Sequence, residues 1–218
     1  RPCSAGSGRG FGPSGVRTSF RRSGTLRGNP VMAKAERDLL SFILTDGTEI
    51  LQFTSDSEFY IEREEDRPTV FDFISQALEE DNVTFENSLY RQIYEAYSEL
   101  YYQGLDQDLI VKRLLDGEDR RIAFATERLS NVETYELSVK NLKDSMMNRG
   151  TWLTKFVPKA ILVFQNSRLE CRLDELNARV KQLTDPSSEK ELNATLEELM
   201  EVQKMMKKVN VLLGREKE

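Results

Sequence analysis

The sequence predicts an all-α protein, made of a small helical bundle followed by a long helix and a C-terminal antiparallel helical hairpin. Apolar residues recur at helical spacing from Ala33 onward, and turn-forming residues separate the segments. Leucines then repeat at four-three spacing on both sides of a polar corner at 185–188. This second pattern is typical of two helices folded back on each other.

The first 31 residues differ in composition from the rest of the chain. Seven of the twelve glycines lie here, among serines and arginines, with little apolar surface to bury. We therefore expect residues 1–31 to form a flexible linker or tail. Gly10, Gly12 and Gly15 form a G-x-G-x-x-G pattern, but coil-forming sequence flanks it on both sides. A dinucleotide site needs a strand before this pattern and a helix after it, so we interpret the pattern as coil.

Residues 32–150 are expected to form the bundle. A helix over 33–44 stops at Gly47, and a second helix opens after Pro68-Thr69. Residues 48–53 and 58–64 fit either short extended pieces or a loop. Segment 86–104 carries an apolar stripe beside a stripe of four tyrosines, which predicts a central helix packed on two sides. Two shorter helices follow over 106–117 and 118–130, and we interpret Asp106 and Asp108 as helix-start residues instead of metal ligands.

Residues 151–218 are expected to form the hairpin subdomain. Because proline is tolerated mainly in the first helical turn, the long helix should start or kink at Pro158 and run to about Thr184. The predicted seam of this helix consists of Leu162, Leu169, Leu173, Leu176, Val180 and Leu183. The predicted seam of its partner consists of Leu192, Leu196, Leu199, Met206 and Leu213, with Gln203 and Asn210 at two positions that should be apolar.

The composition argues against catalysis. The chain has no histidine and only two cysteines, Cys3 and Cys171, so the commonest general base and the usual zinc ligands are missing. No phosphate-binding loop or nucleophile motif is present in the sequence. We therefore expect a chain that is not an enzyme by itself and that needs no cofactor or metal. Two cysteines cannot form a disulfide framework, which fits a reducing, cytoplasmic location.

Charge and hydropathy narrow the class of partner. The longest apolar run, 160–164, is far too short to cross a bilayer. The net charge is −6, and the first 35 residues contribute +7, so the remainder carries −13. Because an acidic body repels phosphate, we expect little direct nucleic-acid binding and a protein partner instead.

The order of several segments is distinctive. A helix "AERDLLSFIL" is followed by "FDFISQALEEDNVTFENSLYRQIYE", a connector "YELS" and a junction "FVPKAIL" before the terminal hairpin. Over residues 33–218 this order resembles the C-terminal, helicase-binding domain of bacterial DNA primase, in particular the Bacteroidetes-type sequences. The resemblance implies a non-catalytic fragment of an RNA polymerase that makes primers in DNA replication. Residues 1–31 would occupy the place of the linker from its polymerase core.

The resemblance also implies partners. The bundle would stimulate the ring-shaped replicative helicase, the hairpin would dock on the helicase's N-terminal domains, and the tail of single-stranded DNA-binding protein could be a further contact. We expect the hairpin to bind its partner through Arg172, Leu176, Arg179, Leu183, Leu192, Leu196, Glu197 and Met200. Two alternatives stay open: the N-terminal domain of a replicative helicase, and a structural coiled-coil protein that dimerises through the hairpin.

Overall fold

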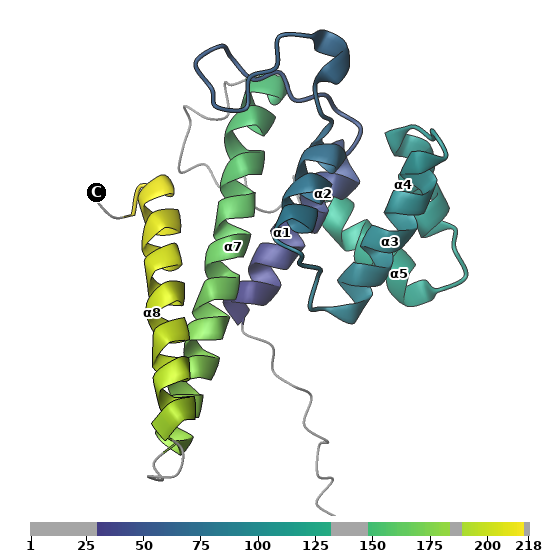
Figure 1. The fold of residues 1–218 in the computed structure, drawn as a ribbon. Coiled ribbons are helices and arrows are strands. Elements are labelled where there is room, and N and C mark those ends of the chain that lie inside the picture. The colour runs from purple at the N-terminus through teal and green to yellow at the C-terminus, as the bar shows by residue number, and fades with distance from the viewer. Residues whose placement is uncertain (1–29, 132–147, 184–188, 216–218) are drawn as a thin grey trace, which may run out of the picture.

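The computed structural model describes residues 30–131, 148–183 and 189–215. The described chain is all-α, as predicted, and Figure 1 shows a bundle with a long helical hairpin beside it. Its helices are α1 (Pro30–Asp46), the short 3₁₀ helix η1 (Glu64–Asp66), α2 (Val70–Glu80), α3 (Ser88–Tyr102), α4 (Gln107–Leu115), α5 (Arg120–Ser130), α7 (Arg149–Gln182) and α8 (Glu189–Leu212). The expected tail 1–31 lies outside the described residues except for its last two.

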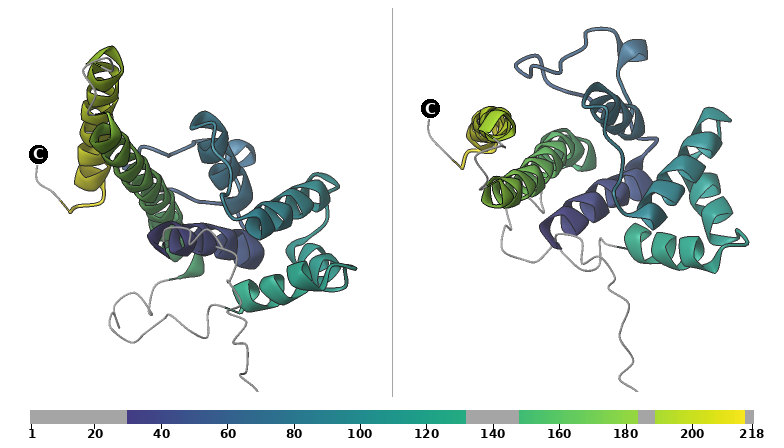
Figure 2. Two further views of the ribbon diagram at one scale, coloured as in Figure 1. Left: turned by 90° about the horizontal axis from the view of Figure 1, so that it is seen from below. Right: turned by 60° about the horizontal axis from the view of Figure 1, so that its bottom comes forward.

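Helix α1 forms the centre of the bundle. Leu39, Leu40, Ile43 and Leu44 are almost completely buried, and α2, α3, α4, α5 and α7 all contact this helix. Figure 2 shows α1 lying between α7 on one side and the α3–α5 group on the other. The helix starts at Pro30, three residues before the predicted start, which suits a proline because the first helical turn needs no N–H donor there.

Polar side chains cap the starts of α2, α3 and α4. Thr69 and Asp72 cap each other at the start of α2, which forms a complete capping box. Asn87 accepts from two backbone N–H groups of α3, and Asp106 accepts from the Leu109 N–H of α4 at 2.9 Å. The interpretation of Asp106 as a helix-capping residue is therefore confirmed.

The segment between α1 and α2 is mainly a loop. Within residues 47–69 the backbone pairs in one isolated antiparallel bridge, between Ile50 and Thr69, and forms the single turn η1. The rings of Phe53, Phe59 and Phe73 cluster beneath this loop at centroid separations of 5.1–5.4 Å. This apolar cluster fixes the loop against α2.

The tyrosines of α3 pack in the core, as predicted. Tyr97 is fully buried, and the Phe71 ring lies 5.2 Å from Tyr97 and 4.5 Å from Tyr101 between ring centroids. The Tyr97 hydroxyl donates to Gln107 Oε1 at 2.7 Å, and burial raises the pKa of Tyr97 well above its ordinary value. The Gln107 amide in turn donates to the Leu44 carbonyl at the end of α1. These contacts tie α1, α3 and α4 together.

Helix α7 contradicts one boundary predicted from the sequence. It starts at Arg149, nine residues before Pro158, and passes through the proline without interruption. The Asn148 side chain accepts from the Gly150 N–H, and the buried Leu153 and Val157 dock the first turns on the bundle. Packing on both sides of Pro158 outweighs the backbone hydrogen bond that the proline removes. Sequence propensity counts the cost of the proline but not this packing.

The six predicted seam residues of α7 are all buried or half-buried, whereas the predicted α8 seam needs correction. In α8 the residues that face α7 are Leu192, Thr195, Leu199, Val202, Met206 and Val209, with Leu213 just after the helix. Leu196 was predicted in this seam, yet it is 39 % exposed, and Gln203 is exposed as well. The observed seam also repeats every seven residues, but its second position lies one residue earlier than predicted, at Thr195, Val202 and Val209 instead of Leu196, Gln203 and Asn210. The polar Gln203 is therefore a surface residue.

Candidate interaction surface of the hairpin

The far end of the hairpin lies well away from the bundle. The first half of α7 packs along α1, whereas its second half packs against α8 (Figure 1). The buried apolar core of the bundle ends at Phe164, and the buried Leu176 and Val202 lie outside that core, within the hairpin. The corner residues 184–188 lie outside the described residues.

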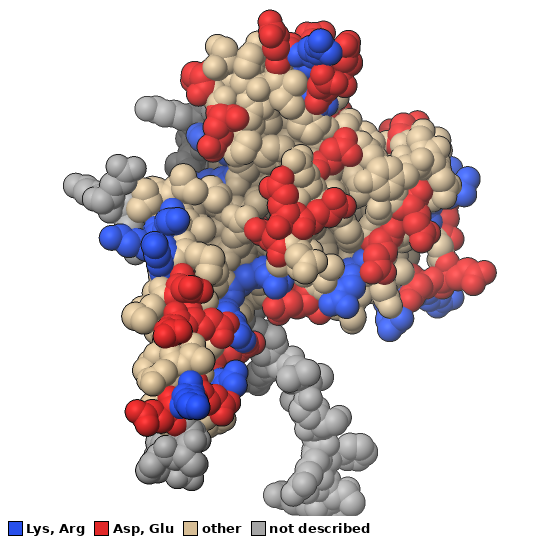
Figure 3. Space-filling model, viewed as in Figure 1, with Lys and Arg blue, Asp and Glu red and all other residues tan. Residues whose placement is uncertain are grey.

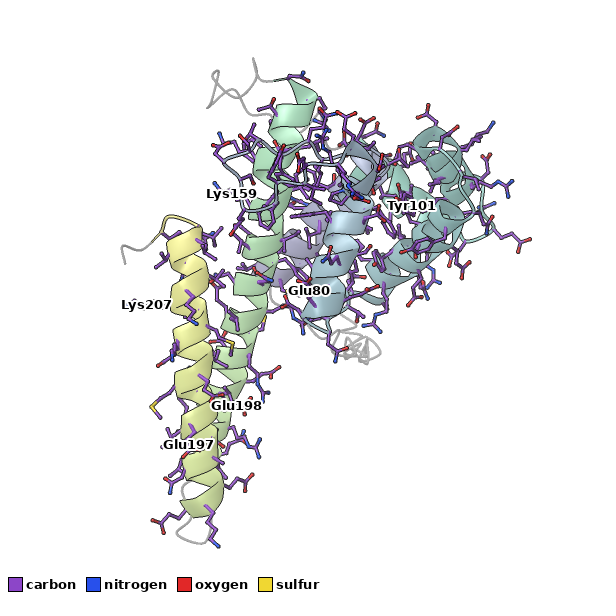
Figure 4. All side chains as sticks on the ribbon, turned by 45° about the horizontal axis from the view of Figure 1, so that its top comes forward. Glu80, Tyr101, Lys159, Glu197, Glu198 and Lys207 are labelled. Carbon is purple, nitrogen blue, oxygen red and sulfur yellow. The ribbon has the colours of Figure 1, made fainter. Side chains whose placement is uncertain are left out.

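Two ion pairs join the helices of the hairpin. Arg172 Nε donates to Glu198 Oε1 at 2.9 Å, and Arg179 donates to Glu191 Oε1 at 2.6 Å. Figure 4 shows Glu198 beside α7 and Glu197 on the outer side of α8. The Glu198 carboxylate raises the pKa of the Arg172 guanidinium. Both arginines were predicted as partner contacts, and the structure places them in pairs that align α7 with α8.

The apolar residues of the predicted contact set separate into two groups. Leu176 is only 1 % exposed, and Leu183 and Leu192 are half-buried, so these three lie within the hairpin. Leu196 and Met200 are exposed by 39 % and 60 % and lie one turn apart on α8. Glu197 lies next to them and is also exposed. We call Leu196, Glu197 and Met200 the docking face.

The base of the hairpin is held on the bundle by polar contacts. Arg149 makes a two-pronged ion pair with Asp46 at the end of α1, with N–O distances of 2.9 and 2.5 Å. Its guanidinium also lies 4.5 Å from the centre of the Trp152 ring. Further along α7, the Gln165 amide donates to Asp81 at 2.7 Å. The start of α7 is thus fixed to α1, and its middle is fixed to the end of α2.

A groove on the opposite side of α1 was not foreseen. It has a volume of about 960 Å³ and lies among α1, α3 and α5. Three arginines, Arg37, Arg121 and Arg128, line it together with Tyr90 and with Phe124, which is 60 % exposed. Arg128 lies over the Phe124 ring at 5.8 Å, and Arg121 pairs with Asp119 at 2.8 Å, which lowers the Asp119 pKa to about 2. The arginines and Phe124 are visible in the sequence, but their convergence needs the fold.

The described residues contain no group of three or more possible metal-ligating side chains. Nor does any described helix combine the length and apolar character that crossing a membrane requires. The connector "YELS", on which the resemblance partly depends, falls at 135–138, outside the described residues.

The comparisons with known proteins identify a family whose description gives no function. Residues 24–216 match the model of a family described as "Domain of unknown function (DUF8430)", and the chain belongs to this family. The match spans the bundle and the hairpin together. No curated protein and no solved structure matches the chain.

Proposed function

We propose that this chain is a non-catalytic, cytoplasmic binding module that recruits a bacterial DNA primase to the replicative helicase and stimulates the helicase. The resemblance of residues 33–218 to the helicase-binding domain of primase supplies the partner. The exposed docking face on a hairpin that lies apart from the bundle is the observation that carries the proposal. A helix with exposed apolar residues one turn apart is suited to a groove on another protein.

The hairpin has features that a docking element needs. Its two ion pairs and buried seam hold α8 in place before the partner arrives, which reduces the entropy lost on binding. Leu196 and Met200 supply apolar contact area, and Glu197 beside them would favour a partner surface with a complementary cation. Contact with the tail of single-stranded DNA-binding protein stays a prediction of the resemblance, and the arginine-lined groove is the first place to test it.

The test compares binding of the cognate replicative helicase by three proteins: the full chain, the Leu196→Glu/Met200→Glu variant, and Leu109→Glu. Leu109 is 49 % exposed on α4, so its substitution is a matched control for adding a carboxylate at an exposed apolar position. We expect the double variant to bind at least tenfold more weakly by calorimetry, because each apolar contact is replaced by a charge that must be desolvated. The Leu109 control should bind as the parent does.

A truncation that removes residues 165–218 tests whether the hairpin is required for helicase binding. It keeps every residue of the bundle core, because that core ends at Phe164. Binding should be lost, together with stimulation of the helicase ATPase. If the full chain fails to bind at micromolar concentration in low salt, the primase interpretation is wrong. A stable homodimer by light scattering that Leu196→Glu/Met200→Glu disrupts would favour the coiled-coil alternative instead.

A further inference from the structure

Lysines gather at the base of the hairpin. By contrast, the chain outside its first 35 residues carries a net charge of −13. Residues 204–212 of α8 carry three lysines and no carboxylate, whereas residues 189–201 of the same helix carry five glutamates and one lysine. Figure 3 shows the blue side chains gathered over the upper part of α8, with red predominating over much of the bundle. Charge is therefore segregated along α8.

Four exposed lysines define this surface, which we call the lysine patch. Lys204, Lys207 and Lys208 lie on the side of α8 that faces away from α7, because the buried Val202 and the half-buried Met206 and Val209 face the seam. Lys159 lies on α7 close to where α8 ends, and Figure 4 shows Lys159 and Lys207 on the same side of the molecule. Within the part of the chain that the structure describes, no carboxylate lies within 4.0 Å of any of these four ammonium groups.

Stability of the fold does not explain the patch. Lysines stabilise a helix C-terminus only in the last turn, and the last turn of α8 has no basic residue. Lys204 and Lys208 are one turn apart, where two like charges destabilise a helix slightly. The nearest carboxylate along the chain, Glu201, forms no ion pair with them among the described residues. The four lysines thus offer attraction to an anion outside the chain.

We propose that the lysine patch binds the sugar–phosphate backbone of a single-stranded nucleic acid. Lysines bind phosphates as point charges on flexible stems, so four of them on one surface suit the repeated phosphates of a flexible strand. Met205 and Leu212 beside the patch are 46 % and 65 % exposed, and they offer unstacked bases an apolar contact. Two such residues are too few to insert a helix into a lipid surface.

The acidic net charge does not prevent this interaction. The Debye length at physiological salt is about 8 Å, so a phosphate at the patch responds mainly to the nearest charges. Our expectation of little direct nucleic-acid binding rested on the charge of the whole body, −13 outside the first 35 residues. The structure shows that this charge is unevenly spread. At the lysine patch we therefore expect nucleic-acid binding, in place of the earlier expectation for the whole body. It stands independently of helicase binding.

The experiment measures binding of fluorescent oligo(dT), about 20 nucleotides long, by anisotropy between 50 and 200 mM salt. Four phosphate contacts on a single strand predict a slope of log K against log salt of about −3, a weakening of roughly 50-fold over that range. Lys204→Gln/Lys207→Gln/Lys208→Gln should reduce the slope to about −1. Replacing the same three residues by arginine should preserve binding, which separates charge from any loss of folding.

A control variant separates the patch from net charge. Lys112→Gln/Arg113→Gln/Arg120→Gln changes the charge equally at exposed residues of α4 and α5, and it should bind oligo(dT) as the parent does. Equal weakening by both glutamine variants would overturn the proposal, as would no binding by the parent at 50 mM salt. Tighter binding to duplex DNA, or binding only to vesicles containing an anionic phospholipid, would also overturn it.

Discussion

At the scale of single residues, Gly47 is the described glycine that leaves least room for a side chain. A Cβ atom at this position would lie 2.1 Å from the Tyr97 hydroxyl oxygen and 2.5 Å from the Ile43 carbonyl oxygen. Tyr97 cannot yield, because it is fully buried and hydrogen-bonded to Gln107. The sequence suggests only that Gly47 ends a helix, whereas the packing requirement becomes visible in the structure.

We expect Gly47→Ala to lower the free energy of unfolding by about 1–3 kcal/mol, as overpacking of a well-packed core does. Urea denaturation followed by circular dichroism measures the change. Gly150→Ala is the matched control, because no atom lies within 4 Å of the Cβ added there and the position is helical. That variant should be neutral or more stable by up to about 1 kcal/mol. Equal stability of Gly47→Ala and the parent would contradict the close packing.

Glu36 is a buried carboxylate that organises the start of α3. It is 2 % exposed and accepts hydrogen bonds from the backbone N–H groups of Glu86 and Asn87. Burial raises its pKa above the ordinary 4.5, although the two backbone hydrogen bonds oppose that shift. The folded state therefore holds the Glu36 proton more tightly than the unfolded chain does.

This difference predicts a pH dependence with a definite sign. The stabilisation from protonating Glu36 is complete below pH 4.5 and is lost as the pH rises through the raised pKa of the folded state. Relative to Glu36→Gln, the parent should therefore gain stability between pH 7 and pH 4.5, by about 1.4 kcal/mol for each unit of pKa shift. Denaturation at several pH values measures the difference. Glu95→Gln, at an exposed position of α3, is the control, and an unchanged difference for Glu36→Gln would refute the assignment.

At the scale of elements, the hairpin has a stability contribution of its own. Leu176 is 1 % exposed and belongs to the contact with α8, not to the bundle core. Leu176→Ala should therefore cost about 2–4 kcal/mol locally. We expect faster amide hydrogen exchange throughout α8 and unchanged exchange in α1.

Leu196→Ala is the matched control for that prediction, since it removes the same atoms from an exposed position of the hairpin. It should leave amide exchange in α8 almost unchanged. If Leu176→Ala accelerated exchange in α1 as much as in α8, the hairpin and the bundle would unfold as one cooperative unit.

The elements also show what the sequence could predict. Helical periodicity and capping residues located α1 to α5, and the leucine repeat located the hairpin. The start of α7 was misplaced because the cost of Pro158 was weighed without the contacts of Leu153 and Val157 on the bundle. Leu196 was misplaced because its apolar side chain suggested the seam position that the less apolar Thr195 occupies, and the rotation of α8 against α7 decides between the two. Both errors come from long-range packing, which local pattern does not contain.

At the scale of the whole molecule, the two proposed surfaces come from one asymmetry. The described part of α8 is acidic in its first half and basic in its second. The docking face lies in the first half, beside the far end of the hairpin, and the lysine patch lies at its base. Candidate contact residues could be identified from the sequence, but their division into seam, ion pairs and exposed face depends on the rotation of α8 about its axis.

The unbroken length of α7 also sets how far the hairpin extends beyond the bundle core. The helix runs for 18 residues beyond Phe164, the last residue of the bundle core, and this corresponds to about 27 Å of rise. A protein held at the far end of the hairpin is kept at that stand-off from the bundle, and the braced pair of helices works as a spacer. Shortening both arms by matched turns would bring the partner closer in steps of about 5.4 Å, which makes the separation itself an adjustable property of the complex.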